Sequence, residues 1–332
     1  MPMKACFSSR AERRCAIGMV WFLLPGMCAL LSLPPALAAA RRPPPRLADA
    51  HIYTWIGNTR PWDRRLHVSG YRLGCDTGDP QGCVREASQA VAQEGLSQIF
   101  LSMFMDPRRT VDDARAYSRL SLSHPYLVEA GFDDFVDRYQ NLFGRPGFDP
   151  VSWLRSVVRA VKSDNANLAF GITLYEDELD SPYLRPPYLP ADVARSVGYV
   201  HLYLHYRTDA PYYALYVERT KRLFPQARVI AGLYAYDRID YIPCAPAKPH
   251  AACAPGEEIQ LYQQALSAAA QMMKDGRIAG IEFYPGFFGR EAEWGGWKHP
   301  DYCAPARVAQ CIDDTHTMRE KTVAVLSAAL GW

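Results

Sequence analysis

Apolar and polar residues alternate in two different patterns along this chain of 332 residues. Short apolar runs, rich in β-branched and aromatic residues, end in polar positions, and each run predicts a buried β-strand. Between the runs, apolar residues recur every three or four positions, which is the pattern of amphipathic helices. The predicted strands cover residues 51–57, 98–106, 167–175, 199–207, 227–236 and 277–286.

Helices are predicted after most of these strands, so the two element types alternate through the chain. The predicted helices cover residues 84–94, 111–122, 132–142, 150–162, 212–224, 257–274 and 315–330. Such alternation favours an α/β fold with parallel strands. Residues 58–82 are polar and contain many Gly, Pro and Asp residues, so they are expected to form a long loop.

A closed (β/α)8-type TIM barrel needs eight strands, two more than the pattern identifies. The missing strands are expected near Tyr126, over residues 126–128, and in the region of Cys303. An open, doubly wound sheet is the competing fold. Long loops with many polar and aromatic residues follow the strands, and no Gly-rich phosphate-binding turn does, so the barrel is favoured over a dinucleotide-binding fold.

The first forty residues differ from the rest. Three arginines, the last being Arg14, precede an apolar run over residues 16–33, and Ala36-Leu37-Ala38 suits signal peptidase. We therefore predict a signal peptide over residues 1–38, a Pro-rich exit segment over 39–50 and a single barrel domain over 51–332. A retained anchor is the alternative. Cleavage predicts a periplasmic or secreted protein without stable membrane insertion.

Charge excludes one class of partner. Removal of residues 1–38 leaves 33 basic and 34 acidic residues, a net charge of about −1 in place of the +2 of the full chain. No basic field remains to attract nucleic acid. The pattern gives no indication of the oligomeric state.

Six cysteines remain after the predicted leader, in three closely spaced pairs. An even count in an exported protein favours disulfides over a metal site, and the chain has no CxxC motif or Cys-His cluster. The spacing favours three local disulfides that clip loops, which would be Cys75–Cys83, Cys244–Cys253 and Cys303–Cys311.

Side chains alternate along a barrel strand between the surrounding helices and the barrel axis. When the aliphatic positions are assigned to the helices, the axial positions become aromatic and polar toward the C-terminal strand ends, where TIM barrels bind substrates. Aromatic faces and charged groups converging there suit a sugar ring. The residues expected to bind substrate are Trp55, Asp106, Tyr175, Tyr203, Arg207, Tyr234, Asp237, Arg238, Tyr284 and Trp294.

Two groups of acids are candidates for catalysis, because glycoside hydrolysis needs a proton donor and a nucleophile or base. Glu176 and Asp177 follow one strand, and Glu282 lies inside another. We predict Glu176 as the acid and Glu282 as the nucleophile or base. Side-chain alternation favours Asp177 over Glu176 as the axial residue, so both stay candidates.

Structural alternatives stay open for several of these residues. The acids after residue 175 also suit a solvated turn, and Glu282 also suits an ion pair with Arg207 or Arg238. Asp106, before a proline, also suits a helix cap. Trp294 also suits packing against the Cys303 loop.

A metal site is the weaker interpretation of two histidines. His201 and His205 stand four residues apart, but on a strand this spacing separates them by about 13 Å, too far for one ion. No obligatory metal or other cofactor is therefore expected.

Part of the chain resembles secreted bacterial proteins of the glycosyl-hydrolase-like TIM-barrel kind. The resemblance covers less than a third of the chain. It is carried by Tyr203, Arg207, residues 224–225 and 231–234, Asp237, the helix with Gln271 and residues 276–281. The resemblance implies a barrel fold and a carbohydrate substrate.

The sequence thus predicts an exported glycoside hydrolase acting on a polysaccharide or oligosaccharide through paired carboxylates. A non-catalytic carbohydrate-binding barrel, serving the assembly or turnover of an envelope glycan, is the alternative. A metal-dependent polysaccharide deacetylase at His201 and His205 is the third hypothesis.

Overall fold

The computed structural model describes residues 51–55, 64–235, 244–245, 253, 256–284 and 308–332. All of them belong to one compact unit, residues 44–332. The predicted signal peptide and exit segment lie outside the described residues. Among the helices of the described part, none combines the length and the apolar character that a membrane span requires.

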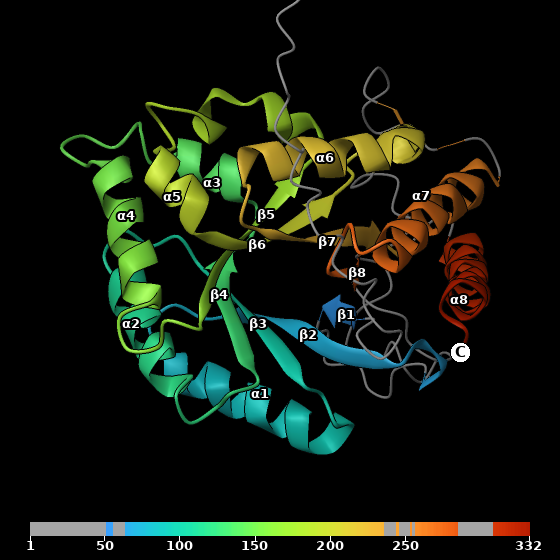
Figure 1. Cartoon of the computed structure of the whole chain (residues 1–332), viewed down its shortest axis with the longest axis horizontal. Helices are drawn as coiled ribbons and strands as arrows, with labels where there is room; N and C mark the ends of the chain where they lie inside the picture. The colour runs from blue at the N-terminus through green and yellow to red at the C-terminus, as the bar shows by residue number, and fades with distance from the viewer. Residues whose placement is uncertain (1–50, 56–63, 236–243, 246–252, 254–255, 285–307) are drawn as a thin grey trace, which may run out of the picture. The chain divides into compact units, whose positions relative to one another are not determined.

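Eight parallel strands form a closed barrel, in which each strand pairs with the next and β8 pairs with β1 (Figure 1). This confirms the predicted TIM barrel over the open sheet. The strands are β1 (His51–Trp55), β2 (Val68–Cys75), β3 (Gln98–Met103), β4 (Leu127–Phe132), β5 (Ala169–Tyr175), β6 (Val197–Tyr203), β7 (Arg228–Tyr234) and β8 (Gly280–Tyr284).

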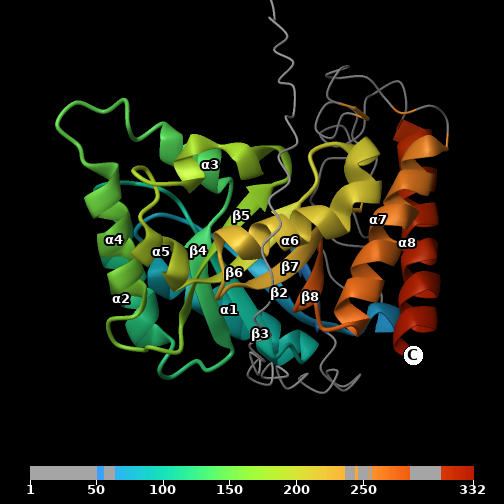
Figure 2. The same ribbon diagram turned by 45° about the horizontal axis from the view of Figure 1, so that its top comes forward.

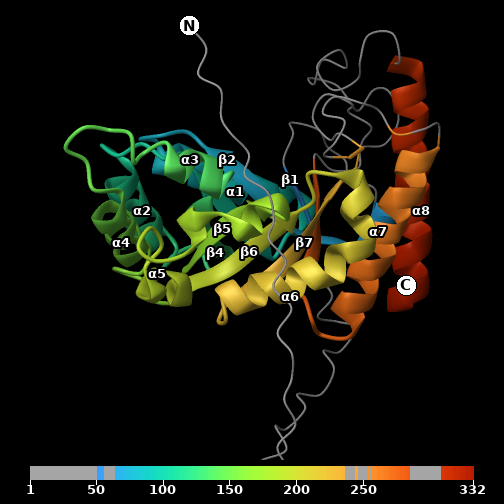
Figure 3. The same ribbon diagram turned by 90° about the horizontal axis from the view of Figure 1, so that it is seen from above.

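The helices lie outside the strands, and the last two run side by side (Figures 2 and 3). The α-helices are α1 (Pro80–Glu94), α2 (Thr110–Leu120), α3 (Phe135–Gln140), α4 (Pro150–Val161), α5 (Ala191–Ser196), α6 (Tyr213–Leu223), α7 (Glu257–Lys274) and α8 (Val308–Leu330). The 3-10 segments of the described residues are η2 (Arg64–Leu66), η3 (Asp177–Asp180), η4 (Pro182–Leu184) and η5 (Arg207–Tyr212). The hydroxyls of Tyr262 and Thr322, 2.6 Å apart, join α7 to α8.

Helix starts follow the local sequence. Asp149 caps α4 by accepting the N–H groups of Val151 and Ser152, with a proline at the first helical position, as predicted. Asp79 caps α1 in the same way, and Gly95 ends it with φ of 70°. The cap places the start of α1 at Pro80, four residues before the predicted one.

The predicted loop over residues 58–82 was wrong, because it contains β2. Gly70 and Gly74 made this segment look like a turn. In the barrel, a Cβ at position 70 would lie 2.2 Å from the carbonyl oxygen of Gln98, so glycine allows β2 to approach β3. The side chains of Tyr71 and Leu73 between the glycines pack into the core.

The strand expected near Tyr126 is β4, which is longer than its predicted core of three residues. The strand expected near Cys303 lies outside the described residues, and the barrel closes with β2 as the remaining strand. Predicted strand ends were generally too late, since β3 ends at Met103 and β6 at Tyr203.

Two sets of side chains fill the interior as the alternation predicted. The helix-facing positions join one large apolar core that contains Ile52, Leu101 and Val200. The axial positions near the N-terminal strand ends form a separate cluster of Tyr53, Phe100, Tyr199 and Ile230.

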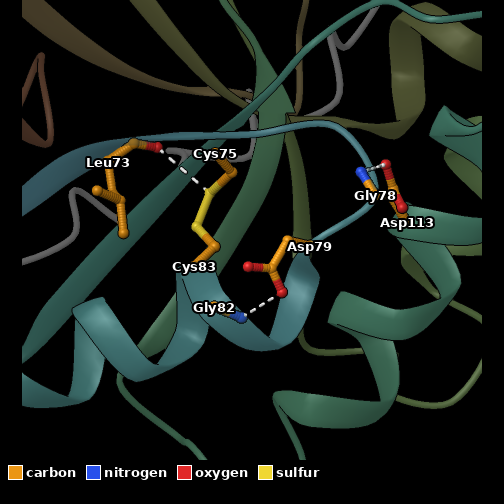
Figure 4. Close-up of a disulfide and its surroundings, with 7 residues drawn as sticks. All are labelled: Leu73, Cys75, Gly78, Asp79, Gly82, Cys83 and Asp113. Carbon is orange, nitrogen blue, oxygen red and sulfur yellow. Dashed lines mark hydrogen bonds between the residues drawn. A yellow bond between two sulfur atoms is a disulfide. The ribbon is translucent and has the colours of Figure 1, made fainter.

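Two of the three predicted disulfides occur in the described residues. Cys75 at the end of β2 is bonded to Cys83 in the first turn of α1, next to the Asp79 cap (Figure 4). Cys244 is bonded to Cys253. The predicted Cys303–Cys311 pair lies outside the described side chains. Cys244, Cys253 and Glu257 lie close enough to share an ion, but the disulfide removes the thiolates that would bind it.

Candidate active site

The barrel axis carries a layer of four charged residues where TIM barrels usually have branched aliphatic ones. Each even-numbered strand contributes one residue, as expected for side chains that point to the axis at one level. They are Arg72 from β2, Glu129 from β4, His201 from β6 and Glu282 from β8, and all four are 0% exposed. Buried charges are costly unless they are paired, so this layer marks a site that the fold maintains.

The four side chains are linked by close charge contacts. The two ring nitrogens of His201 each lie 3.0 Å from a carboxylate, Nδ1 from Glu282 and Nε2 from Glu129. The Arg72 guanidinium lies 3.9 Å from the other oxygen of Glu282. The Tyr203 hydroxyl donates to that same oxygen at 2.6 Å. Glu282 therefore does not pair with Arg207, and the alternative of a structural ion pair applies with Arg72 and His201 instead.

The layer shifts the pKa values of its members in opposite directions. Burial alone would raise the pKa of Glu282, but the charge and hydrogen bond of His201, with Arg72 and Tyr203, hold it below its ordinary value. Burial alone would lower the pKa of His201, but the charges of Glu282 and Glu129 raise it to about 8. Glu282 is thus ionised and His201 protonated at neutral pH.

Five predicted substrate-binding residues come together on the C-terminal side of this layer. Tyr175, Tyr203 and Tyr234 form a buried cluster against which Trp55 and Tyr284 pack. The ring of Tyr203 lies where a side chain at position 232 would be, so Gly232 makes room for it. The Arg72 guanidinium lies 5.0 Å from the Trp55 ring centroid, which links the charged layer to the aromatic cluster.

Glu176 lies in a different environment from Glu282. It is 2% exposed, and its oxygens accept the backbone N–H groups of His205 at 2.7 Å and Tyr206 at 3.0 Å. Burial raises its pKa to about 9, against the effect of those amides. The raised pKa suits the predicted acid, whereas the two backbone bonds suit a residue that anchors the chain after β6.

Asp177 is the accessible member of the acidic run. Its side chain is 40% exposed and lies 3.0 Å from Nδ1 of His205, whose ring stacks on Tyr175 at 3.6 Å. Glu178 is buried and accepts the N–H of Tyr175, and burial raises its pKa to about 8. Hence the run is not a solvated turn, since two of its three acids bind backbone amides.

The sequence interpretation missed two acids at the end of β4, Asp133 and Asp134. Burial raises the pKa of Asp133, the charge of Arg72 opposes that rise, and the Asp134 carboxylate adds to it. Asp134 accepts the Tyr175 hydroxyl at 2.8 Å and pairs with Arg138 at 3.1 Å. The sequence did contain a signal for this end of β4, because the acids at 129 and 133 fall on one face of a strand with apolar neighbours.

Other predicted residues lie elsewhere. Asp106 accepts the N–H of Arg108 in the turn before α2 but does not cap this helix, whose N-cap is Arg109. Arg207 lies in η5 rather than in a strand, with Nη1 donating to the carbonyl of Tyr234, and it lines a small pocket against α7. Asp237, Arg238 and Trp294 lie outside the described residues.

Comparison with known proteins bears on the fold. No protein-family model and no curated protein matches this sequence. A GH5_18 protein from Streptomyces cattleya is 12% identical, with a TM-score of 0.50 over 78% of this chain and 72% of its own. A glycoside hydrolase family 5 enzyme from Prevotella bryantii B14 is 11% identical, with a TM-score of 0.47 over 86% and 96%. A GH18 chitinase from Pseudoalteromonas aurantia is 11% identical, with a TM-score of 0.46 over 70% and 93%.

The chain has a TIM-barrel fold, which it shares with the Streptomyces cattleya protein. At about one residue identical in ten, this similarity concerns the fold alone. A fold of this kind does not determine function, which depends on the side chains of the barrel axis and mouth.

The raised pKa values of three buried groups predict that stability falls as pH rises. Glu176, Glu178 and His201 all hold protons more tightly in the folded state, with pKa values of about 9, about 8 and about 8. The unfolded chain loses these protons first, so the free energy of unfolding should fall between about pH 5 and about pH 9. Thermal unfolding at about pH 6 and about pH 9 measures this, and Glu178→Gln should reduce the difference. An unfolding midpoint that rises toward pH 9 would contradict it.

Proposed function

We propose that this barrel hydrolyses a glycosidic bond, with Glu282 as nucleophile or base and Asp133 as proton donor. The observation that carries the proposal is that their surroundings move their pKa values apart, that of Glu282 down and that of Asp133 up, while the charge of Arg72 acts on both. Carboxyl groups whose pKa values are moved apart suit the roles of acid and base.

The aromatic cluster supplies the binding surface of the proposal. Trp55 and Tyr284 are partly exposed and meet edge to face, with ring centroids 5.6 Å apart, at the C-terminal strand ends. Aromatic faces pack against the C–H groups of a sugar ring, and the Tyr175 and Tyr203 hydroxyls lie among carboxylates that can also bind sugar hydroxyls. A polysaccharide or oligosaccharide is therefore the proposed substrate.

Asp177 remains the second candidate for the proton donor. It is the accessible one of the two acids predicted from sequence, whereas both oxygens of Glu176 bind backbone amides. Asp133 is preferred because burial raises its pKa and because it shares the Arg72 guanidinium with Glu282.

Digestion of a panel of polysaccharides by the mature protein tests the proposal, with new reducing ends as the readout. Wild type should cleave at least one glycan, and Asp133→Asn should lower kcat by about 10²- to 10⁴-fold, the usual contribution of a general acid. Asp177→Asn should lower it less than tenfold. The reverse order would make Asp177 the donor, and glycan binding without cleavage by wild type would overturn the enzymatic proposal.

A non-catalytic carbohydrate-binding barrel is the second candidate function. It is favoured by one observation: Glu282 is fully buried beneath Tyr203, so a substrate reaches it only if this ring moves. The deacetylase hypothesis has less support, because His201 binds two carboxylates and no group of potential metal ligands among the described residues contains either histidine.

Export is part of the proposal. The predicted signal peptide and the disulfides Cys75–Cys83 and Cys244–Cys253 fit a protein that folds in an oxidising compartment, the periplasm or the medium.

A further inference from the structure

Glu129 is the member of the axial layer that the proposed reaction does not use. It is fully buried, and His201 stands between it and Glu282. A carboxylate that served only to neutralise Arg72 would not need to engage a histidine from the far side. Neutralisation of Arg72 therefore does not explain why His201 lies between Glu129 and Glu282.

Hydrogen-bonding capacity determines the state of His201. An ionised carboxylate only accepts hydrogen bonds, and a neutral imidazole has only one N–H to donate. Both ring nitrogens lie 3.0 Å from carboxylate oxygens, Nε2 in a hydrogen bond with Glu129 and Nδ1 in a close charge contact with Glu282, so a neutral ring would turn one unprotonated nitrogen toward an anionic oxygen and an imidazolium would not. With Arg72, the imidazolium then balances the two carboxylates, and loss of its proton would leave the layer with one uncompensated negative charge.

The space around Glu129 is built for this side chain. A Cβ at Gly171 would lie 2.1 Å from the Glu129 carboxyl carbon, and a Cβ at Gly131 would lie 2.7 Å from its Oε1. The two neighbouring strand positions thus lack side chains where Glu129 reaches across. Phe100 from β3 meets the His201 ring edge to face at 5.2 Å and closes that side.

We infer that Glu129 and His201 are positioning residues for Glu282. Glu129 holds the His201 ring in orientation and in its imidazolium form, and the imidazolium holds the Glu282 carboxylate ionised and in one rotamer. The inference rests on the proposed function for what Glu282 does, but not for the state of the network itself. Besides Glu129, the charged and titratable groups that act on His201 and Glu282 include Arg72 from β2, Tyr203 from β6, Tyr53 from β1 and Tyr213 from α6.

The network is tested without turnover by NMR titration of the full-length mature protein labelled with ¹⁵N-histidine. His201 is assigned by the signal that His201→Gln removes, or by its contact with Phe100 if that variant does not fold. In wild type, both nitrogens of this ring should stay protonated well above the ordinary histidine range. Glu129→Gln should move the titration down by about one pH unit or more, since it removes one of the two carboxylates.

Glu178→Gln is the matched control for this titration, because it also replaces a buried barrel carboxylate but one that binds the Tyr175 amide and not His201. It should leave the His201 titration unchanged. A ring that titrates in the ordinary range, or one that responds equally to both variants, would overturn the inference.

The positioning role is read from the pH profile of kcat on a cleaved glycan. Glu129→Gln should lower kcat by about 10- to 100-fold with KM changed little, as expected when a reacting group loses its fixed place. It should also shift the alkaline limb of the kcat profile to lower pH, because His201 then loses its proton at lower pH. Glu129→Asp should recover part of the rate. If Glu129→Gln turns over the glycan with an unshifted pH profile, the positioning role alone is overturned. If the NMR titration behaves as expected but wild type cleaves no glycan, the proposed function alone is overturned.

Discussion

Replacing Glu282 by glutamine is expected to lower kcat by at least about 10³-fold, which corresponds to roughly 4 kcal/mol of transition-state stabilisation. The amide keeps the shape of the side chain and can still accept the Tyr203 hydroxyl, but it carries no charge to attack or to activate water. Sugar affinity should change little, because the aromatic cluster remains. Initial rates on a cleaved glycan, corrected for the folded fraction, measure the effect.

The control for this variant is Glu218→Gln, which removes a carboxylate that pairs with Arg277 on the outside of the barrel at 2.8 Å. Its activity should equal that of wild type. If Glu282→Gln cleaves the same glycan within tenfold of the wild-type rate, the 282 carboxylate takes no part in the chemistry, and its buried pairing is structural.

Replacing Arg72 by methionine is expected to destabilise the fold by about 3–5 kcal/mol, because two buried carboxylates lose the only guanidinium of the axial layer. Arg72 is 0% exposed, lies 3.9 Å from Glu282 and donates to the carbonyl of Phe132 at 3.3 Å. Methionine preserves much of the volume, so the loss reports charge rather than a cavity. Urea unfolding, with the midpoint and slope compared to wild type, measures it.

Arg65→Met is the matched control, because Arg65 pairs with Glu320 at 2.8 Å while its side chain is 51% exposed. Exposed pairs contribute at most about 1 kcal/mol. The double variant Arg72→Met with Glu282→Gln should lose less stability than the two single losses combined, since each change removes the charge that the other leaves uncompensated. An Arg72→Met loss no larger than that of Arg65→Met would contradict the account.

The period-two pattern of strands made much of the site predictable. Once Ile281 and Phe283 were assigned to the helix side, Glu282 had to point to the axis, and the same reasoning placed Tyr203 and Tyr234 beside it. A local pattern sufficed because barrel strands give every axial side chain one direction.

The partners of Glu282 were not predictable in the same way. Arg72 was not recognised as an axial residue because the glycines around it made β2 look like a turn. Glu129 was not recognised because it lay just beyond the predicted end of the strand near Tyr126. His201 was considered only as a metal ligand. Pairing across the axis depends on strand register, which the alternation within one strand does not contain.

The even-strand origin of the charged layer has a consequence for how the chain folds. The charged layer of Arg72, Glu129 and His201 is complete only when β8, the last strand, lies between β7 and β1 and adds the carboxylate of Glu282. An intermediate without β8 would lack the carboxylate that pairs with both Arg72 and His201, so partial barrels gain little by becoming compact. We therefore expect assembly to be nearly all-or-none, and a chain truncated before residue 280 should collapse without acquiring a fixed interior.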